Sequence, residues 1–192
     1  MTTLAEALAT RETALAQRGF RVRPARLSDV PRMAEMINNF ASQGEMLPRS
    51  ASELYENIRD FLIIADENDE VAATASLHIL WDDLAEIKSV AVSEALHGQG
   101  IGAYLVEKCV EEAARMELPT VFVLTHKPGF YEKLQFERAD VLAFPRKVWS
   151  ECIRCPKFSN CNEIAMSRPV AREFTADLPD DDDLLDPIPT RA

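Results

Sequence analysis

The sequence has neither a long apolar run nor an excess of basic residues. No apolar stretch approaches the roughly 18 residues that a membrane-spanning helix needs. The chain has 21 lysines and arginines against 32 aspartates and glutamates, and its net charge of −11 argues against non-specific binding to nucleic acids or anionic membranes. Residues Met1–Gly19 are alanine-rich and charged, unlike a secretion signal. We therefore expect a cytoplasmic protein without membrane or nucleic-acid partners.

The length of 192 residues suits one globular domain with terminal extensions. Apolar spacing over Leu4–Gln17, followed by Gly19, predicts a short helix, so residues 1–19 are expected to form a helical extension. The domain itself is expected over residues 20–170.

The C-terminal residues 171–192 are expected to form an acidic, disordered tail. Residues 177–186 hold six aspartates among prolines and leucines, a composition that cannot bury enough apolar surface to order itself. The alternative is that Leu184, Leu185 and Ile188 dock on a partner subunit in a homodimer.

The remaining pattern predicts strands that form hairpins before a single strand–helix–strand crossover. This order implies a mixed sheet rather than an all-parallel one. The predicted elements are a strand at Phe20–Arg23, a helix that starts at Ser28–Pro31, a short helix from Ser52, strands at Phe61–Ala65, Val71–Leu80 and Ile87–Val92, a helix through Tyr104–Met116, a strand at Thr120–Leu124, a helix at Gly129–Leu134, a strand at Phe136–Val141 and a last strand near 163–170.

A glycine turn joins the strand Ile87–Val92 to the next helix. Backbone N–H groups at such a helix start, together with the helix dipole, form an anion site that commonly takes phosphate. Residues 98–103 also match the dinucleotide pattern G-x-G-x-x-[GA]. That interpretation is disfavoured, because three strands precede the turn and the strand Thr120–Leu124 is followed by Thr-His-Lys rather than an acidic residue.

Two further segments are HGQGIGA at 97–103 and FYEKLQF at 130–136. These motifs and the order of elements resemble the GNAT superfamily of N-acetyltransferases. Within the superfamily, MLPRS at 46–50, LHILW at 77–81 and AEIKSVAV at 85–92 resemble the short N-acetylglutamate synthases of arginine biosynthesis. The resemblance implies an α/β (α+β) fold with a mixed, mostly antiparallel sheet flanked by helices.

The resemblance also implies an acetyl-CoA site, with pantetheine along the end of the central strand and the pyrophosphate on the turn. Glycines allow the backbone to approach the phosphates, so an acidic protein can bind this polyanion through amides and the helix dipole. Two positions depart from the family pattern, His97 where arginine or glutamine is usual and Gln135 where glycine is usual. The expected acetyl-CoA residues are Val90, Ala91, Val92, His97, Gly98, Gln99, Gly100, Ile101, Gly102 and Ala103.

Glu86 and Lys88 are the candidate residues for the acceptor amine. Strand alternation places both side chains on one face. Glu86 is the candidate base for the protonated α-amine, and Lys88 is a candidate receiver for a substrate carboxylate. The alternative is a solvated ion pair between them.

Three further residues take roles from the resemblance or from their place in the chain. Arg49 is the second candidate for binding a substrate carboxylate, with an exposed loop arginine as the alternative. Tyr131 is the candidate acid for the leaving thiolate, with a packed aromatic as the alternative. Thr125 ends its strand where the sheet is expected to split and is a candidate substrate contact, whereas His78 and His126 have no assigned partner.

Cys152, Cys155 and Cys161 form a C-x₂-C-x₅-C cluster, whereas Cys109 is expected in the core. Three thiolates suggest zinc or an iron–sulfur centre, with Glu163, His126, another subunit or water as the fourth ligand. A redox pair and unliganded packing are the alternatives.

These expectations combine into an acetyl-CoA-dependent N-acetyltransferase that acts on a small amino acid, L-glutamate or L-glutamine. The competing interpretations are the same chemistry on another amine, such as a protein N-terminus or lysine, and a non-catalytic module that senses acetyl-CoA or a metal.

Overall fold

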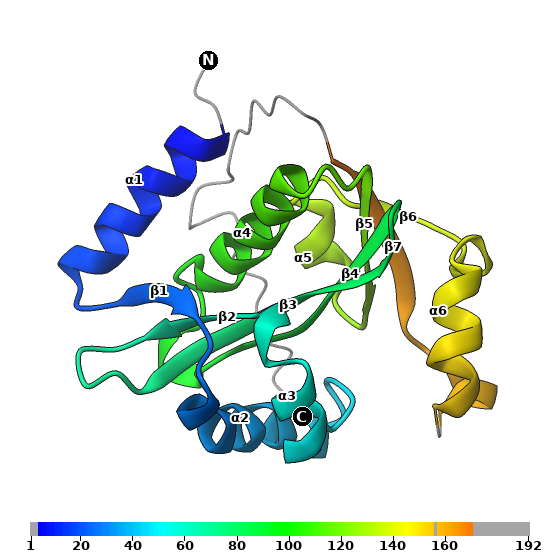
Figure 1. Ribbon diagram of the computed structural model, residues 1–192, viewed down its shortest axis with the longest axis horizontal. Helices are drawn as coiled ribbons and strands as arrows, with labels where there is room; N and C mark the ends of the chain where they lie inside the picture. The colour runs from blue at the N-terminus through cyan, green and yellow to red at the C-terminus, as the bar shows by residue number, and fades with distance from the viewer. Residues whose placement is uncertain (1–3, 156, 171–192) are drawn as a thin grey trace, which may run out of the picture.

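The computed structural model describes residues 4–155 and 157–170 (Figure 1). The predicted acidic tail lies outside these residues. In the described part, one seven-stranded sheet has the strand order β1-β2-β3-β4-β5-β7-β6. In this sheet only β4 and β5 pair in parallel, and the other neighbouring strands are antiparallel, which confirms the predicted mixed sheet. The strands are β1 (Arg21–Pro24), β2 (Phe61–Ala65), β3 (Val71–Trp81), β4 (Leu84–Val92), β5 (Thr120–Thr125), β6 (Glu137–Arg138) and β7 (Ile164–Pro169).

Helices cover both faces of this sheet (Figure 1). On one face, α1 and α4 pack over a cluster that includes Ile64, while α2 and α3 bury Ile63 and Ala65 on the other. Because side chains alternate along a strand, the continuous apolar run of β2 serves both clusters. The α-helices are α1 (Leu4–Gln17), α2 (Val30–Ser42), α3 (Ala51–Glu56), α4 (Ile101–Arg115), α5 (Pro128–Glu132) and α6 (Pro145–Ser150). Among the described residues, no helix combines the length and apolarity that crossing a bilayer requires.

Most predicted elements are confirmed within one or two residues, with three corrections. The second short helix begins at Ala51 with Ser50 as its cap, since the Ser50 hydroxyl accepts a hydrogen bond from the amide of Glu53. The strand predicted at Phe136–Val141 is only Glu137–Arg138, because the Asp140 carboxylate then turns the chain by accepting from the amide of Leu142. Helix α6 was not predicted.

The sheet opens between β4 and β5. These strands pair only at Ala85 with Val121 and at Glu86 with Phe122, although β4 continues to Val92. On the β3 side, Ser89 and Val90 together oppose a single residue, which makes a bulge. Ser89 adopts a φ of 55°, a strained value for a serine. The separation implied by the family resemblance is therefore present, and the second half of β4 borders the opening.

Candidate active site

The glycine turn leads from the opened end of β4 into α4. Gly98 and Gly100 adopt φ values of 70° and 69°, in the left-handed region that other residues rarely enter. Gly100 immediately precedes α4, whose first N–H groups have no partner in the helix. At Gly102 an added Cβ would lie 3.6 Å from Phe130 and Val92, an ordinary contact. The left-handed glycines and the N-terminal amides of a 15-residue helix, which have no partner within the helix, fit the phosphates of coenzyme A.

His97 and Gln99 of this turn have partners that the sequence did not reveal. The Nε2 atom of His97 lies 2.8 Å from the carbonyl oxygen of Val92, so His97 fastens the turn to the end of β4. The Arg18 guanidinium donates a hydrogen bond to the Gln99 side chain. A cation from the segment after α1 therefore stands beside the turn, and no local pattern in the sequence links these two residues.

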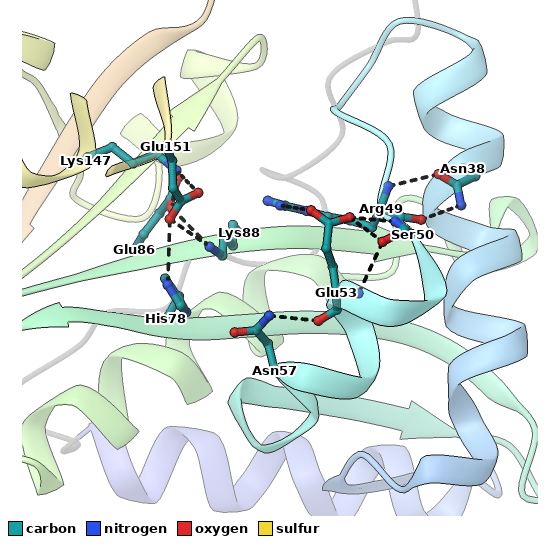
Figure 2. A network of polar contacts seen from close by, with 10 residues as sticks. All are labelled: Asn38, Arg49, Ser50, Glu53, Asn57, His78, Glu86, Lys88, Lys147 and Glu151. Carbon is teal, nitrogen blue, oxygen red and sulfur yellow. Dashed lines mark hydrogen bonds and ion pairs between the residues drawn. The ribbon is translucent and has the colours of Figure 1, made fainter. Parts of the chain in front are cut away.

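The predicted carboxylate receivers Arg49 and Lys88 line one open pocket of about 180 Å³ at the bulge of β4. The pocket also contains His78 and the carboxylates of Glu53 and Glu151. In Figure 2, Arg49 lies beside Glu53 of α3, while Lys88 of β4 and His78 of β3 point toward Glu151, which follows α6. Its other lining residues are Leu54, Asn57, Asp60, Phe61, Ser76 and Ser89. Thr125 and Tyr131 do not line this pocket.

Arg49 is held by its backbone rather than by its guanidinium. The Asn38 side chain donates to the carbonyl oxygen of Arg49 at 2.9 Å and accepts from its amide at 3.0 Å (Figure 2). The guanidinium itself makes a long contact, 3.8 Å, with a carboxylate oxygen of Glu53. The position of Arg49 is therefore fixed, while its strongest donors remain available to a ligand.

A buried charge cluster lies next to the pocket (Figure 2). Lys147 donates to Glu86 Oε2 and Glu151 Oε2, both at 2.7 Å, and only 3% of Glu86 and 5% of Lys147 are exposed. Lys88 makes looser contacts, 3.4 Å to Glu151 and 3.6 Å to Glu86. Glu86 and Lys88 thus share a face as predicted, but their pair is largely buried rather than solvated.

The pKa values of Lys88 and Lys147 shift in opposite directions. Burial lowers the pKa of Lys88, and the carboxylates of Glu86 and Glu151 only partly oppose this. Burial also acts to lower the pKa of Lys147, but the same two carboxylates outweigh it and raise that pKa. For Glu151, burial acts upward, while Lys147 and Lys88 bring its pKa down to about 2.

His78, which had no assigned partner, belongs to the same network. Its Nδ1 atom lies 2.7 Å from Asp60 Oδ2, and its Nε2 atom is 3.7 Å from Glu151 Oε1. Sequence reasoning also missed Lys147 and Glu151. The only local signal was their spacing of four residues, which places two side chains on one face of a helix turn.

Tyr131 is packed between aromatic rings, with its centroid 4.9 Å from that of Phe130 and 5.4 Å from that of Phe136. Burial raises the pKa of Tyr131, and nearby Cys109 and Glu86 add to the effect, so the phenol keeps its proton at neutral pH. Thr125 is 8% exposed, and its hydroxyl accepts a hydrogen bond from the amide of Lys127 at 2.9 Å.

Among the residues that the structure describes, the cysteine cluster does not form the predicted metal site. Cys152 and Cys155 are half-buried and Cys161 is exposed, because two short 3₁₀ turns separate the thiols. Within 4–155 and 157–170, no three His, Cys, Asp or Glu side chains are grouped to hold a metal. Burial raises the pKa of the Cys152 thiol. Cys109 is fully buried, as expected, and burial raises its pKa to about 12.

Comparisons with known proteins agree with this geometry. Residues 31–136 match the Acetyltransferase (GNAT) family. An uncharacterised N-acetyltransferase from Chlorobaculum tepidum is 38% identical over 76% of this chain and 93% of its own length. An amino-acid acetyltransferase from Mycobacterium tuberculosis is 33% identical over 69% of this chain and 77% of its own length.

A solved structure supports the same assignment. A protein from Mycobacterium tuberculosis, crystallised in complex with CoA and NLQ, superimposes with a TM-score of 0.67 at 29% identity, covering 78% of this chain and 99% of that one. Residues 31–136, which match the family, include β4, the glycine turn, α4 and β5, the parts whose geometry suits coenzyme A. The chain therefore belongs to the GNAT family and is an acetyl-CoA-dependent N-acetyltransferase.

Proposed function

We propose that the protein acetylates the α-amine of a small acidic amino acid, L-glutamate or the related L-glutamine, as the first step of arginine biosynthesis. The observation that carries this proposal is the convergence of Arg49 and Lys88 on one pocket at the bulge of β4. The relative named amino-acid acetyltransferase supports an amino acid as the acceptor.

The two cations are suited to bind substrate carboxylates because their contacts within the protein are loose. Within the described residues, the carboxylate contacts of Arg49 and Lys88 measure 3.4 Å or more, whereas Lys147 makes two at 2.7 Å. Charge-assisted hydrogen bonds are strongest below about 3 Å, so an incoming carboxylate can offer Arg49 and Lys88 better partners than they have. Lys147 is already satisfied and is not a substrate ligand.

The proposed reaction is direct transfer within a ternary complex. Glu86 accepts a proton from the ammonium group of the substrate, directly or through water, and the free amine attacks the thioester carbonyl carbon. The carbon–sulfur bond then breaks, and Tyr131 donates its phenolic proton to the leaving thiolate of coenzyme A. The raised pKa of Tyr131 suits a group that must remain protonated until that moment.

A panel of acceptors tests the proposal. Purified protein is incubated with acetyl-CoA and, separately, L-glutamate, L-glutamine, L-aspartate, L-lysine or a peptide with a free N-terminus. Free coenzyme A and the N-acetylated product are then measured. Glutamate or glutamine should give the highest kcat/KM, and turnover restricted to lysine or the peptide would overturn the proposal.

Lys88→Met sharpens this test, with Lys157→Met as its control, because Lys157 is an exposed lysine away from the pocket. Losing a charged hydrogen bond, worth about 1.5–3 kcal/mol, should raise the KM for glutamate about 10- to 100-fold. The KM for acetyl-CoA should not change.

A further inference from the structure

We propose that Lys147 of α6 is a positioning residue that holds Glu86 and, through Glu151, orients Lys88 and His78 toward the acceptor. The inference rests on the proposed function for the roles of Glu86 and Lys88. Helix α6 lies beyond residues 31–136, the part that matches the GNAT family. The contact is therefore made by a segment outside the part that the family model matches.

Two short contacts hold the ammonium group of Lys147 in place. Its ammonium group donates to Glu86 and Glu151 at 2.7 Å each and is almost completely removed from water. A buried ammonium is costly without such partners, so movement of α6 away from β4 would leave Lys147 and Glu86 uncompensated. Lys147 thus ties a helix of six residues to the central strand.

Glu151 connects this tie to the pocket. One of its oxygens receives Lys147, while the other faces Lys88 at 3.4 Å and His78 at 3.7 Å (Figure 2). Glu151 remains ionised at neutral pH, because its pKa is lowered to about 2. Asp60 holds the opposite nitrogen of His78 at 2.7 Å. The directions of Lys88 and His78 therefore depend on the place of Glu151.

Glu86 contacts two ammonium groups, those of Lys147 and Lys88. Lys147 supplies the shorter of its two ammonium contacts, 2.7 Å against 3.6 Å for Lys88. Without Lys147, Glu86 and Glu151 would compete for Lys88 and draw it away from a substrate carboxylate. The titratable groups that face Glu86 from the elements around it are Lys88, His78, Tyr131, Lys147, Glu151 and Cys152.

The test compares Lys147→Met with Lys147→Arg and with the exposed control Lys157→Met. For each variant, kcat/KM for glutamate is measured from pH 5 to 9, together with the separate KM values for glutamate and acetyl-CoA. Lys147→Met should move the acid side of the profile up by about one pH unit, since a nearby opposite charge favours an ionised carboxylate. It should also raise the glutamate KM about 10-fold or more, and Lys147→Arg should restore part of both effects.

Two further variants separate this inference from the proposed function. Glu151→Gln retains the contact between Lys147 and Glu86, so it should raise the glutamate KM while leaving the acid side of the profile in place. If Glu86→Gln is as active as the parent protein, the assignment of the base fails. The inference itself is overturned if the folded Lys147→Met protein has the same glutamate KM as the parent. If Lys147→Met does not fold, an unchanged glutamate KM in Glu151→Gln overturns it instead.

Discussion

The buried ion pair between Glu107 of α4 and Arg168 of β7 provides a quantitative test of how the fold is held together. Arg168 donates to Glu107 Oε1 at 2.6 Å and to the carbonyl oxygen of Leu134 at 2.8 Å. Both charged residues are only 2% exposed. Glu107→Gln preserves the shape of the side chain but removes the carboxylate charge that faces the buried guanidinium at 2.6 Å.

Removing one partner of a buried pair typically costs about 3–5 kcal/mol. For a protein of this size, each kcal/mol lowers the melting temperature by roughly 2–4 °C, so Glu107→Gln should lower it by about 6–20 °C. Glu112→Gln on the same helix is the control. Its partner Arg115 is 58% exposed, and surface pairs contribute only about 0–1 kcal/mol.

A double-mutant cycle measured by thermal and urea unfolding completes the test. Glu107→Leu combined with Arg168→Met removes both charges and leaves the Leu134 carbonyl without this donor, a loss of about 1–3 kcal/mol. The double variant should therefore be more stable than the summed losses of the single variants Glu107→Leu and Arg168→Met predict. Strict additivity, or a Glu107→Gln protein that melts within about 2 °C of the parent, would refute the reasoning.

Three shorter predictions concern other parts of the chain. Gln135 has a φ of 63°, where a residue with a side chain pays about 1–2 kcal/mol of backbone strain. Glycine removes this strain but loses more backbone entropy on folding, so Gln135→Gly should raise the free energy of unfolding in urea by up to about 1 kcal/mol. Hydrogen bonding to Arg23 holds the pKa of Asp29 below its usual value, so Asp29 stabilises the fold above about pH 4 and ceases to do so as the pH falls through that lowered pKa. Urea midpoints of Asp29→Asn should therefore fall less steeply between pH 5 and 2. Gly100→Ala should raise the KM for acetyl-CoA about 10-fold. Alanine disfavours the left-handed backbone of Gly100, so the turn that presents the amides of α4 to the cosubstrate should be distorted.

Each of these predictions has an outcome that contradicts it. A less stable Gln135→Gly protein would show that the Gln135 side chain contributes more than its strained backbone costs. An unchanged acid dependence in Asp29→Asn would remove Asp29 from the groups that limit acid stability. Gly44→Ala is the control for Gly100→Ala, since Gly44 has a φ of 81° and open space around it. Equal KM values in these two variants would mean that the turn does not bind the cosubstrate.

Local patterns in the sequence were enough for most of the fold. In α2, Met33, Met36, Ile37 and Phe40 are buried together, because their helical spacing places these side chains on one face. The helix predicted at Leu4–Gln17 is observed with the same bounds, and Gly19 has the left-handed φ of 82° that ends it. The turn at Gln135 also forms, although glycine is absent there, since packing around Tyr131 and Phe136 outweighs the backbone strain.

The sequence by itself therefore determined most of the elements, the mixed sheet, the glycine turn and the family, all of which rest on residues close together in the chain. It also placed Glu86 and Lys88 on one face of a strand. Only the tertiary structure decided what surrounds them, since Lys147 lies 61 residues from Glu86 on a helix of six residues, too short to show a period. The ion pairs of Glu151 and His78 likewise join separate elements, and contacts across such distances leave no trace in local spacing.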